Sequence, residues 1–123
     1  MTDFFRKVSE ATKAMRSLFP ETPLQENVYL SQKYGARVFL KREDLSPVRS
    51  YKIRGAFNTM RHALKFNPSI KKFACASAGN HAQGVAFACR YFNVKGYIFM
   101  PVTTPQQKID KTQAFGGKNI EIK

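Results

Sequence analysis

Lys52 is the first residue of this sequence whose type and position could do chemistry. It lies where a loop that contains Pro47 meets the first turn of an expected helix. A lysine amine is a nucleophile only when it is neutral, and desolvation, a helix N-terminus and nearby cations all favour that form. Because Arg49 and Arg54 flank Lys52, we interpret its amine as a candidate for covalent bonding to a carbonyl compound. A solvated surface lysine is the alternative that this position alone leaves open.

A second segment could bind an anion, because it consists of small and polar residues between an expected strand and an expected helix. Its sequence is Ser77-Ala78-Gly79-Asn80-His81-Ala82-Gln83-Gly84. Backbone N–H groups at such a helix start bind anions, and Ser77 with these amides could hold a carboxylate. The Asn80 amide offers a donor and an acceptor to a ring hydroxyl. Alternatively, the segment is a tight turn in which Asn80 or Ser77 caps the helix.

Alternating helices and strands must position these two segments. Apolar residues at spacings of three and four predict helices at 3–18, 53–66, 81–92 and 106–115, and a short helix at 24–34 that Gly35 ends. Short apolar stretches predict strands at 37–41, 73–76, 96–100 and 119–122. This order predicts an α/β fold with a parallel sheet covered by helices on both faces, a three-layer αβα arrangement.

Composition limits the class of protein further. The chain has 123 residues, 43% of them hydrophobic, which suffices for one core. It has no apolar stretch of the roughly 20 residues that a membrane span needs and no signal-peptide pattern, so we expect a soluble cytoplasmic protein. Cys75 and Cys89 lie in apolar segments and are expected to be free thiols. No metal-ligand spacing surrounds them, and no metal site is expected.

The net charge of +13 raises nucleic-acid binding as an alternative function. The basic residues form no run longer than two, which is typical of a solvated surface and counts against that alternative. Between Leu45 and Ile109 there are ten Lys or Arg and no Asp or Glu. This stretch should therefore attract anions such as a phosphorylated cofactor and a carboxylate substrate. An acidic partner, or an acidic remainder of the same polypeptide, would neutralise the positive charge of this stretch equally well.

Five segments in this order resemble the threonine dehydratases of the tryptophan-synthase-like pyridoxal-phosphate enzymes. They lie at 22–24, 40–45, 50–56, 77–84 and 100–108. The resemblance covers nearly the whole chain from Thr22 onward and implies a partial, truncated parallel-sheet fold of the tryptophan synthase β type. Lys52 would carry pyridoxal 5'-phosphate and act as the base on the substrate α-carbon, Asn80 would bond the ring 3-hydroxyl, and Tyr51 would stack on the ring. The substrate carboxylate would be bound by Ser77, Ala78, Gly79 and His81.

The reaction that the resemblance implies is β-elimination of L-threonine to 2-oxobutanoate and ammonia, in isoleucine biosynthesis, with the cofactor as electron sink. Related racemases have a second serine where this chain has Ala78. Because alanine carries no proton, this position favours a dehydratase over a racemase and leaves a serine or 3-hydroxyaspartate dehydratase open.

The family's glycine-rich phosphate loop, and the residue that faces the pyridine nitrogen, lie downstream of the matched segment. We therefore expect residues 1–123 to be the N-terminal part of an incomplete catalytic domain, with weak or absent cofactor binding and no useful turnover alone. An unfinished sheet should expose apolar surface, which self-association or a missing C-terminal half would cover. A non-catalytic interaction module that kept the fold is the remaining alternative.

Overall fold

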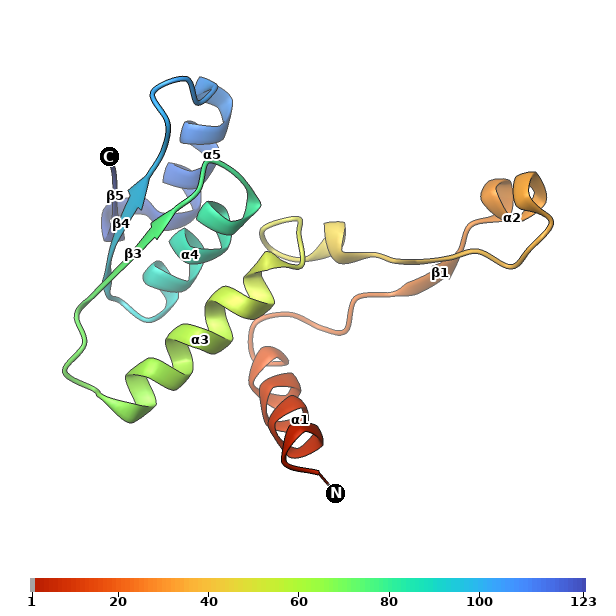
Figure 1. The fold of residues 1–123 in the computed structure, drawn as a ribbon, viewed down its shortest axis with the longest axis horizontal. Helices are drawn as coiled ribbons and strands as arrows, with labels where there is room; N and C mark the ends of the chain where they lie inside the picture. The colour runs from red at the N-terminus through yellow and green to blue at the C-terminus, as the bar shows by residue number, and fades with distance from the viewer. Residues whose placement is uncertain (1) are drawn as a thin grey trace.

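The computed structural model describes residues 2–123, which form a body and a projecting arm (Figure 1). The body contains the helices α1 (Asp3–Met15), α3 (Lys52–Phe66), α4 (Asn80–Tyr91) and α5 (Gln106–Gly116) and the strands β3 (Lys72–Ala76), β4 (Lys95–Phe99) and β5 (Ile120–Ile122). The arm contains β1 (Leu24–Glu26), α2 (Val28–Tyr34) and β2 (Phe39–Lys41). Short 3-10 turns follow β2 (Glu43–Leu45) and α5 (Gly117–Asn119).

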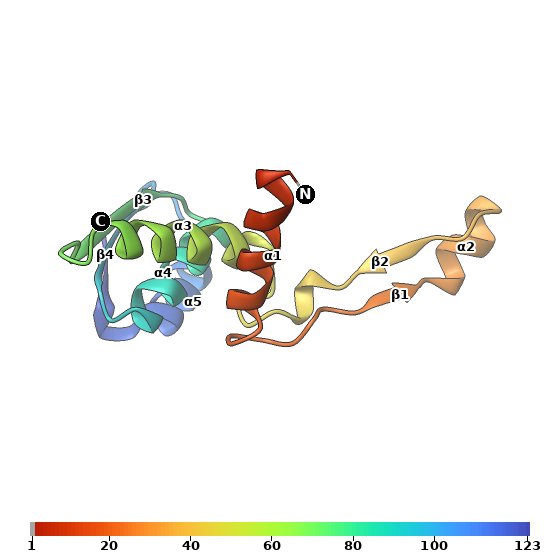
Figure 2. The same cartoon turned by 90° about the horizontal axis from the view of Figure 1, so that it is seen from below.

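The body has a parallel three-stranded sheet in the order β3-β4-β5, which confirms the predicted α/β class. Figures 1 and 2 show α3, α4 and α5 on the same side of this sheet. Side chains alternate between the two faces of a strand. Gly96, Ile98 and Ile120 are buried beneath the helices, because their strands turn these positions toward α4 and α5.

The opposite face of the sheet is uncovered by any helix of residues 2–123 (Figure 2). The pairing of Ala74 with Tyr97 and of Ala76 with Phe99 places these residues on that face. Phe99 is 51% exposed there. The described chain thus supplies the sheet and one of the two expected helical layers, and the sequence-based expectation of exposed apolar surface is confirmed.

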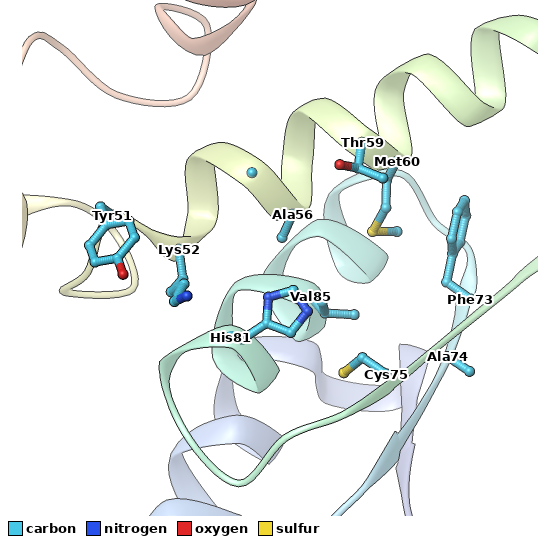
Figure 3. Close-up of a pocket in the computed structure, with 11 residues that line it drawn as sticks. Tyr51, Lys52, Ala56, Thr59, Met60, Phe73, Ala74, Cys75, His81 and Val85 are labelled. Atoms are coloured by element: carbon cyan, nitrogen blue, oxygen red, sulfur yellow. The ribbon is translucent and has the colours of Figure 1, made fainter.

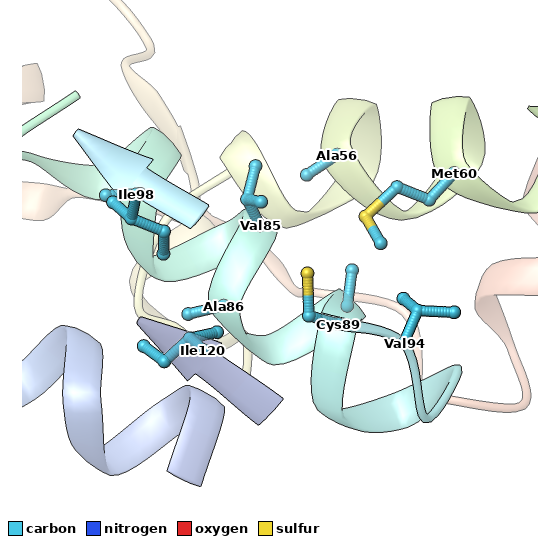
Figure 4. Packing of buried hydrophobic residues seen from close by; sticks show 10 residues of the cluster. Ala56, Met60, Val85, Ala86, Cys89, Val94, Ile98 and Ile120 are labelled. Atoms are coloured by element: carbon cyan, nitrogen blue, oxygen red, sulfur yellow. The ribbon is translucent and has the colours of Figure 1, made fainter. Parts of the chain in front are cut away.

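Two clusters of buried side chains hold the body together. The first joins α3, α4 and the sheet, and Figure 4 shows Ala56 and Met60 of α3 facing Val85 and Cys89 of α4. The second consists of Met15, Phe19, Val48, Ile53 and Phe57, so it joins the end of α1 to the start of α3. Lys52 therefore lies beside Ile53, a fully buried core residue, and the backbone at the lysine is held in place by packing.

The arm begins with a strand that the sequence analysis did not predict. Leu24, Gln25 and Glu26 pair antiparallel with β2, whereas a helix was expected from residue 24. The helix begins only after Asn27, whose side chain accepts a hydrogen bond from the Leu30 N–H at 2.8 Å. Gly35, with φ of 60°, ends it as predicted. A strand of three residues is too short to show a period, so only its pairing with β2 defines it.

The remaining helices and strands agree with the predictions to within two residues at their ends, the usual uncertainty at such a boundary, except α1, which ends three residues earlier than predicted. None of the helices formed by residues 2–123 combines the length and apolar character needed to cross a membrane. Within the same range, no cluster of three or more His, Cys, Asp or Glu side chains could hold a metal ion.

Candidate functional site

Lys52 is the first residue of α3, at the end of a tightly closed loop. The Ser46 hydroxyl closes that loop, since it donates to the Ser50 carbonyl and accepts from the Ser50 N–H, both at 3.0 Å. Val48, inside the loop, is only 1% exposed. Arg49 adopts a φ of 57°, a conformation uncommon for residues other than glycine. These contacts place the start of α3, and with it the lysine, in one defined position.

The Lys52 side chain is exposed, and its ammonium nitrogen lies 5.1 Å from the centre of the Tyr51 ring. No carboxylate among residues 2–123 forms an ion pair with it. Arg54, one of the two cations expected to act on Lys52, is instead paired with Glu43 at 2.8 Å. The charge of Arg54 is therefore largely neutralised and contributes less at Lys52 than its place in the sequence suggested. Because the Lys52 amine has no ion-pair partner among residues 2–123, it is available to a ligand.

An open pocket of about 430 Å³ lies beside Lys52, between α3, α4 and β3 (Figure 3). Lys52 and Tyr51 lie at one end with His81, the second residue of α4. The rest of the lining is mostly apolar and includes Gly55, Ala56, Met60, Phe73, Cys75 and Val85. A volume in the range of about 300–1,000 Å³ with a few convergent polar groups is typical of small-molecule sites.

The loop before α4 is a compact turn in which the Ser77 hydroxyl already accepts a hydrogen bond. The Ser77 Oγ accepts from the Gly79 N–H at 3.2 Å. Gly79 is the N-cap of α4, and no side chain caps the helix there. The N–H groups of Asn80 and His81 therefore have no side-chain partner among residues 2–123, and with the helix dipole they favour an anion.

Asn80 lines a different pocket from Lys52. This second pocket, of about 600 Å³, lies on the other side of the first turn of α4. Its polar lining comprises Asn80, Gln83, Gln107 and the cations Arg49, Lys108 and Lys111. The structure thus brings Lys52, Tyr51 and His81 together and places Asn80 in a neighbouring basic pocket. Ala78 and Gly79 form the bend that precedes α4 and line neither pocket.

Two features of the site were not identified from the sequence. Cys75 lines the same pocket as Lys52, although its sequence context indicated only a free thiol in an apolar segment. The basic pocket was also missed, but its signal was present, because the stretch without acidic residues contains Arg49 and Lys108. Only the packing of α5 beside α4 brings these cations together.

The sequence profile of pyridoxal-phosphate dependent enzymes matches residues 16–123. The chain belongs to this family. Within it, the chain is 51% identical over 117 residues to the biosynthetic L-threonine dehydratase of Staphylococcus epidermidis. That match covers 95% of this chain and 28% of the relative, so the chain spans little more than a quarter of the length of this family member.

Solved structures of the same family share the fold. An aspartate racemase that depends on pyridoxal 5'-phosphate superimposes with a TM-score of 0.87 at 27% identity, over 96% of this chain and 37% of that chain. The processed form of threonine deaminase isoform 2 from Solanum lycopersicum superimposes with a TM-score of 0.81 at 39% identity, over 97% of this chain and 34% of that chain. Of these two structures, the racemase has the higher TM-score and the deaminase has the higher sequence identity. Residue identity bears more directly on the reaction, because one fold serves many reactions.

The residues present fit the aldehyde and ring end of the family's cofactor. The Lys52 amine has no carboxylate partner and opens into a pocket beside an aromatic ring. The Ser50 Oγ, two residues earlier, is buried and has no hydrogen-bond partner among the described residues. A buried hydroxyl forms a hydrogen bond in most proteins, so a ligand or further protein at this position would supply the missing partner of Ser50 Oγ.

Proposed function

We propose that this chain forms the lysine-bearing part of a threonine dehydratase and that Lys52 carries its pyridoxal 5'-phosphate. The observation that supports the proposal is an unpaired lysine amine at the mouth of a pocket of about 430 Å³. The 51% identity to a biosynthetic L-threonine dehydratase supports the choice of reaction.

Each candidate residue has a role in this proposal. When bound, pyridoxal phosphate supplies an electron sink that stabilises negative charge at the substrate α-carbon. The Lys52 amine accepts the proton from that carbon, and the Tyr51 ring packs against the pyridine ring. The substrate carboxylate is held by His81 and by the exposed amides at the start of α4, with Ser77, Ala78 and Gly79 forming the turn. To bond the ring hydroxyl, the Asn80 side chain must turn from the basic pocket, which it lines in this structure, toward the pocket of Lys52.

The proposed substrate is L-threonine, and the products are 2-oxobutanoate and ammonia. We also propose that the reaction serves isoleucine biosynthesis and takes place in the cytoplasm, because the relative is a biosynthetic enzyme that acts on a free amino acid. Further protein, either a second copy or the part of the relatives beyond this match, would cover the open sheet face and supply a phosphate site. The match to only 28% of the relative supports the second of these.

A racemase is the alternative, supported by the TM-score of 0.87 with the aspartate racemase. Racemisation requires a proton donor on the face of the α-carbon opposite the lysine. Ala78, where related racemases carry a serine, has no such group, which favours the dehydratase.

The first test uses this chain as it is. The chain is incubated with pyridoxal phosphate and reduced with borohydride, and the adducts are located by peptide mass spectrometry. The pocket predicts that Lys52 is labelled at least about tenfold more than the exposed Lys33 and Lys65 in the folded chain. Urea-unfolded chain gauges indiscriminate labelling. Equal labelling of all lysines in the folded chain would mean that residues 1–123 have no preformed cofactor site by themselves, and the reaction test below would then decide the function.

The second test measures the reaction. The chain is joined to the remaining part of the Staphylococcus epidermidis dehydratase, and 2-oxo acid formation from L-threonine is followed together with chiral analysis of the remaining amino acid. A dehydratase releases 2-oxobutanoate, and Lys52→Ala abolishes the release. A folded chimera that carries Lys52, makes no 2-oxo acid and converts L- to D-amino acid would favour the racemase.

A further inference from the structure

Glu43 and Arg54 form a bidentate ion pair beside the proposed site. The Nε and Nη2 atoms of Arg54 donate to the two carboxylate oxygens of Glu43, each at 2.8 Å. The Thr22 hydroxyl donates to Glu43 Oε1 at 2.6 Å. The Glu43 carboxylate therefore accepts three hydrogen bonds from two segments of the chain.

This pair is more sheltered than an ordinary surface ion pair. The side chains of Glu43 and Arg54 are 19% and 34% exposed, and Thr22 is buried. Hydrogen bonds from Arg54 hold the pKa of the Glu43 carboxyl below its ordinary value. The guanidinium carbon of Arg54 also lies 5.2 Å from the centre of the Phe19 ring, a cation–π arrangement. Planar bidentate pairing with stacking fixes an arginine more firmly than a single contact does.

The pair ties the base of the arm to the helix that begins with Lys52. Thr22 precedes β1, Glu43 follows β2 and Arg54 lies in the first turn of α3. Lys41, the last residue of β2, also donates to the Thr22 carbonyl. Both strands of the arm are therefore joined at their base to the turn that carries the lysine.

The side chains of Lys52 and Arg54 project from nearly opposite sides of α3. Residues two apart on a helix project about 200° around its axis. Lys52 lines the pocket, whereas neither Arg54 nor Glu43 does. Arg54 thus holds the first turn from the side opposite the pocket, where it contacts neither the cofactor nor the substrate of the proposed reaction.

We propose that Glu43 and Arg54 are positioning residues that fix the direction in which the Lys52 amine enters its pocket. This inference rests on the proposed function, because it assigns the pair a role in the reactivity of that amine. It predicts that loss of either partner leaves a lysine that is present and accessible but no longer selectively labelled.

The test compares Glu43→Gln, Arg54→Gln and their double variant, with Arg54→Lys as the conservative replacement. The matched control is Asp44→Asn, which breaks the adjacent, exposed pair of Asp44 with Arg42. The readout is Lys52 labelling by pyridoxal phosphate and borohydride, relative to Lys33 and Lys65, under conditions in which circular dichroism shows every variant folded. Hydrogen exchange of the backbone amides of residues 52–55 provides a second readout.

We expect each single variant to lower Lys52 selectivity about tenfold and the double variant to lower it no further, because the two residues act as one unit. Arg54→Lys should recover part of the loss, and Asp44→Asn should label like the unsubstituted chain. Amide exchange at residues 52–55 should accelerate in the variants of the pair alone.

Selective labelling in the unsubstituted chain with unchanged selectivity in the folded variants overturns the positioning role and leaves the proposed function standing. Uniform labelling of the unsubstituted chain also overturns the positioning role, because the ion pair is then intact and Lys52 is still not selective, and the proposed function is then decided by the chimera. If Glu43→Gln does not fold, the same measurements are made on Thr22→Val and Arg54→Lys. Each of these changes weakens the hydrogen bonds to the Glu43 carboxylate and keeps the negative charge at position 43 and the positive charge at position 54. Unchanged selectivity and amide exchange in these two folded variants equally overturn the proposal.

Discussion

Gly84 on α4 lies directly against the backbone of Lys52 on α3. A Cβ atom at position 84 would stand 3.2 Å from the carbonyl carbon and oxygen of Lys52 and from the Ile53 nitrogen. These are main-chain atoms of a helix, so they cannot move aside individually. The absence of a side chain at Gly84 lets the two helices approach at the residue that we propose carries the cofactor.

Gly84→Ala should therefore displace the first turn of α3. We expect a loss of unfolding free energy of about 1–3 kcal/mol, as is common when a close contact is overfilled, together with weaker selective labelling of Lys52. Urea unfolding and adduct mapping measure the two effects. The control for the stability measurement is Gly55→Ala, where an added Cβ meets no atom within 4 Å. In a helix interior that change should stabilise by up to about 1 kcal/mol. A Gly84→Ala chain as stable and as selectively labelled as the original would contradict the role of this contact.

Replacement of Lys52 should separate function from stability. The side chain is exposed and forms no ion pair with residues 2–123. Lys52→Gln removes a cation from the N-terminus of α3, where the helix dipole disfavours it. We expect the unfolding free energy to stay within about 0.5 kcal/mol of the original while the adduct at position 52 disappears. A large destabilisation, measured by urea unfolding, would indicate that Lys52 is a structural residue.

The two cysteines should respond differently to an occupied pocket. Burial raises the pKa of the Cys89 thiol to about 11 and raises that of Cys75 from its ordinary value. Both should therefore react more slowly with a thiol reagent at pH 8 in the folded chain than in the unfolded chain, because the thiolate is the reactive form. Cys75 lines the pocket of Lys52, whereas Cys89 does not.

Reduction of the cofactor onto Lys52 should slow the modification of Cys75 further and leave Cys89 unchanged. Iodoacetamide labelling followed by peptide mass spectrometry measures both rates in one sample. Equal rates at Cys75 with and without the adduct would place the ligand outside this pocket.

The ion pair of Glu43 should make stability depend on pH in the acidic range. Hydrogen bonds from Arg54 lower the pKa of Glu43 below its ordinary value of 4.5. A carboxyl with a lowered folded-state pKa stabilises the fold above its unfolded-state value, and this contribution is lost as pH falls through the folded-state value. The difference in unfolding free energy between the original chain and Glu43→Gln should thus be constant above about pH 4.5 and shrink below it. Urea titrations between neutral and acidic pH measure this difference, and a difference that grows with acidity would contradict the assigned sign.

Local sequence determined the order of helices and strands and the position of Lys52. The apolar spacing of α3, α4 and α5 predicted each helix, because a helix buries one face at a fixed period. Asn67, Gly35 and the small residues before α4 mark boundaries through backbone preferences that need no distant partner. The motifs around Lys52 and Asn80 were sufficient to indicate the family, since both lie within short continuous segments.

Only the tertiary structure decided which of these residues meet. Arg54 was expected to add positive charge near Lys52, but Glu43, eleven residues earlier, and Thr22, earlier still, bind it instead. Asn80 and His81 are adjacent in sequence yet line different pockets, because neighbouring residues at a helix start point to different sides. The close approach of Gly84 to Lys52 likewise depends on how two helices cross. Contacts of this kind join segments that are separated in sequence, so their geometry arises from packing and has no local signature.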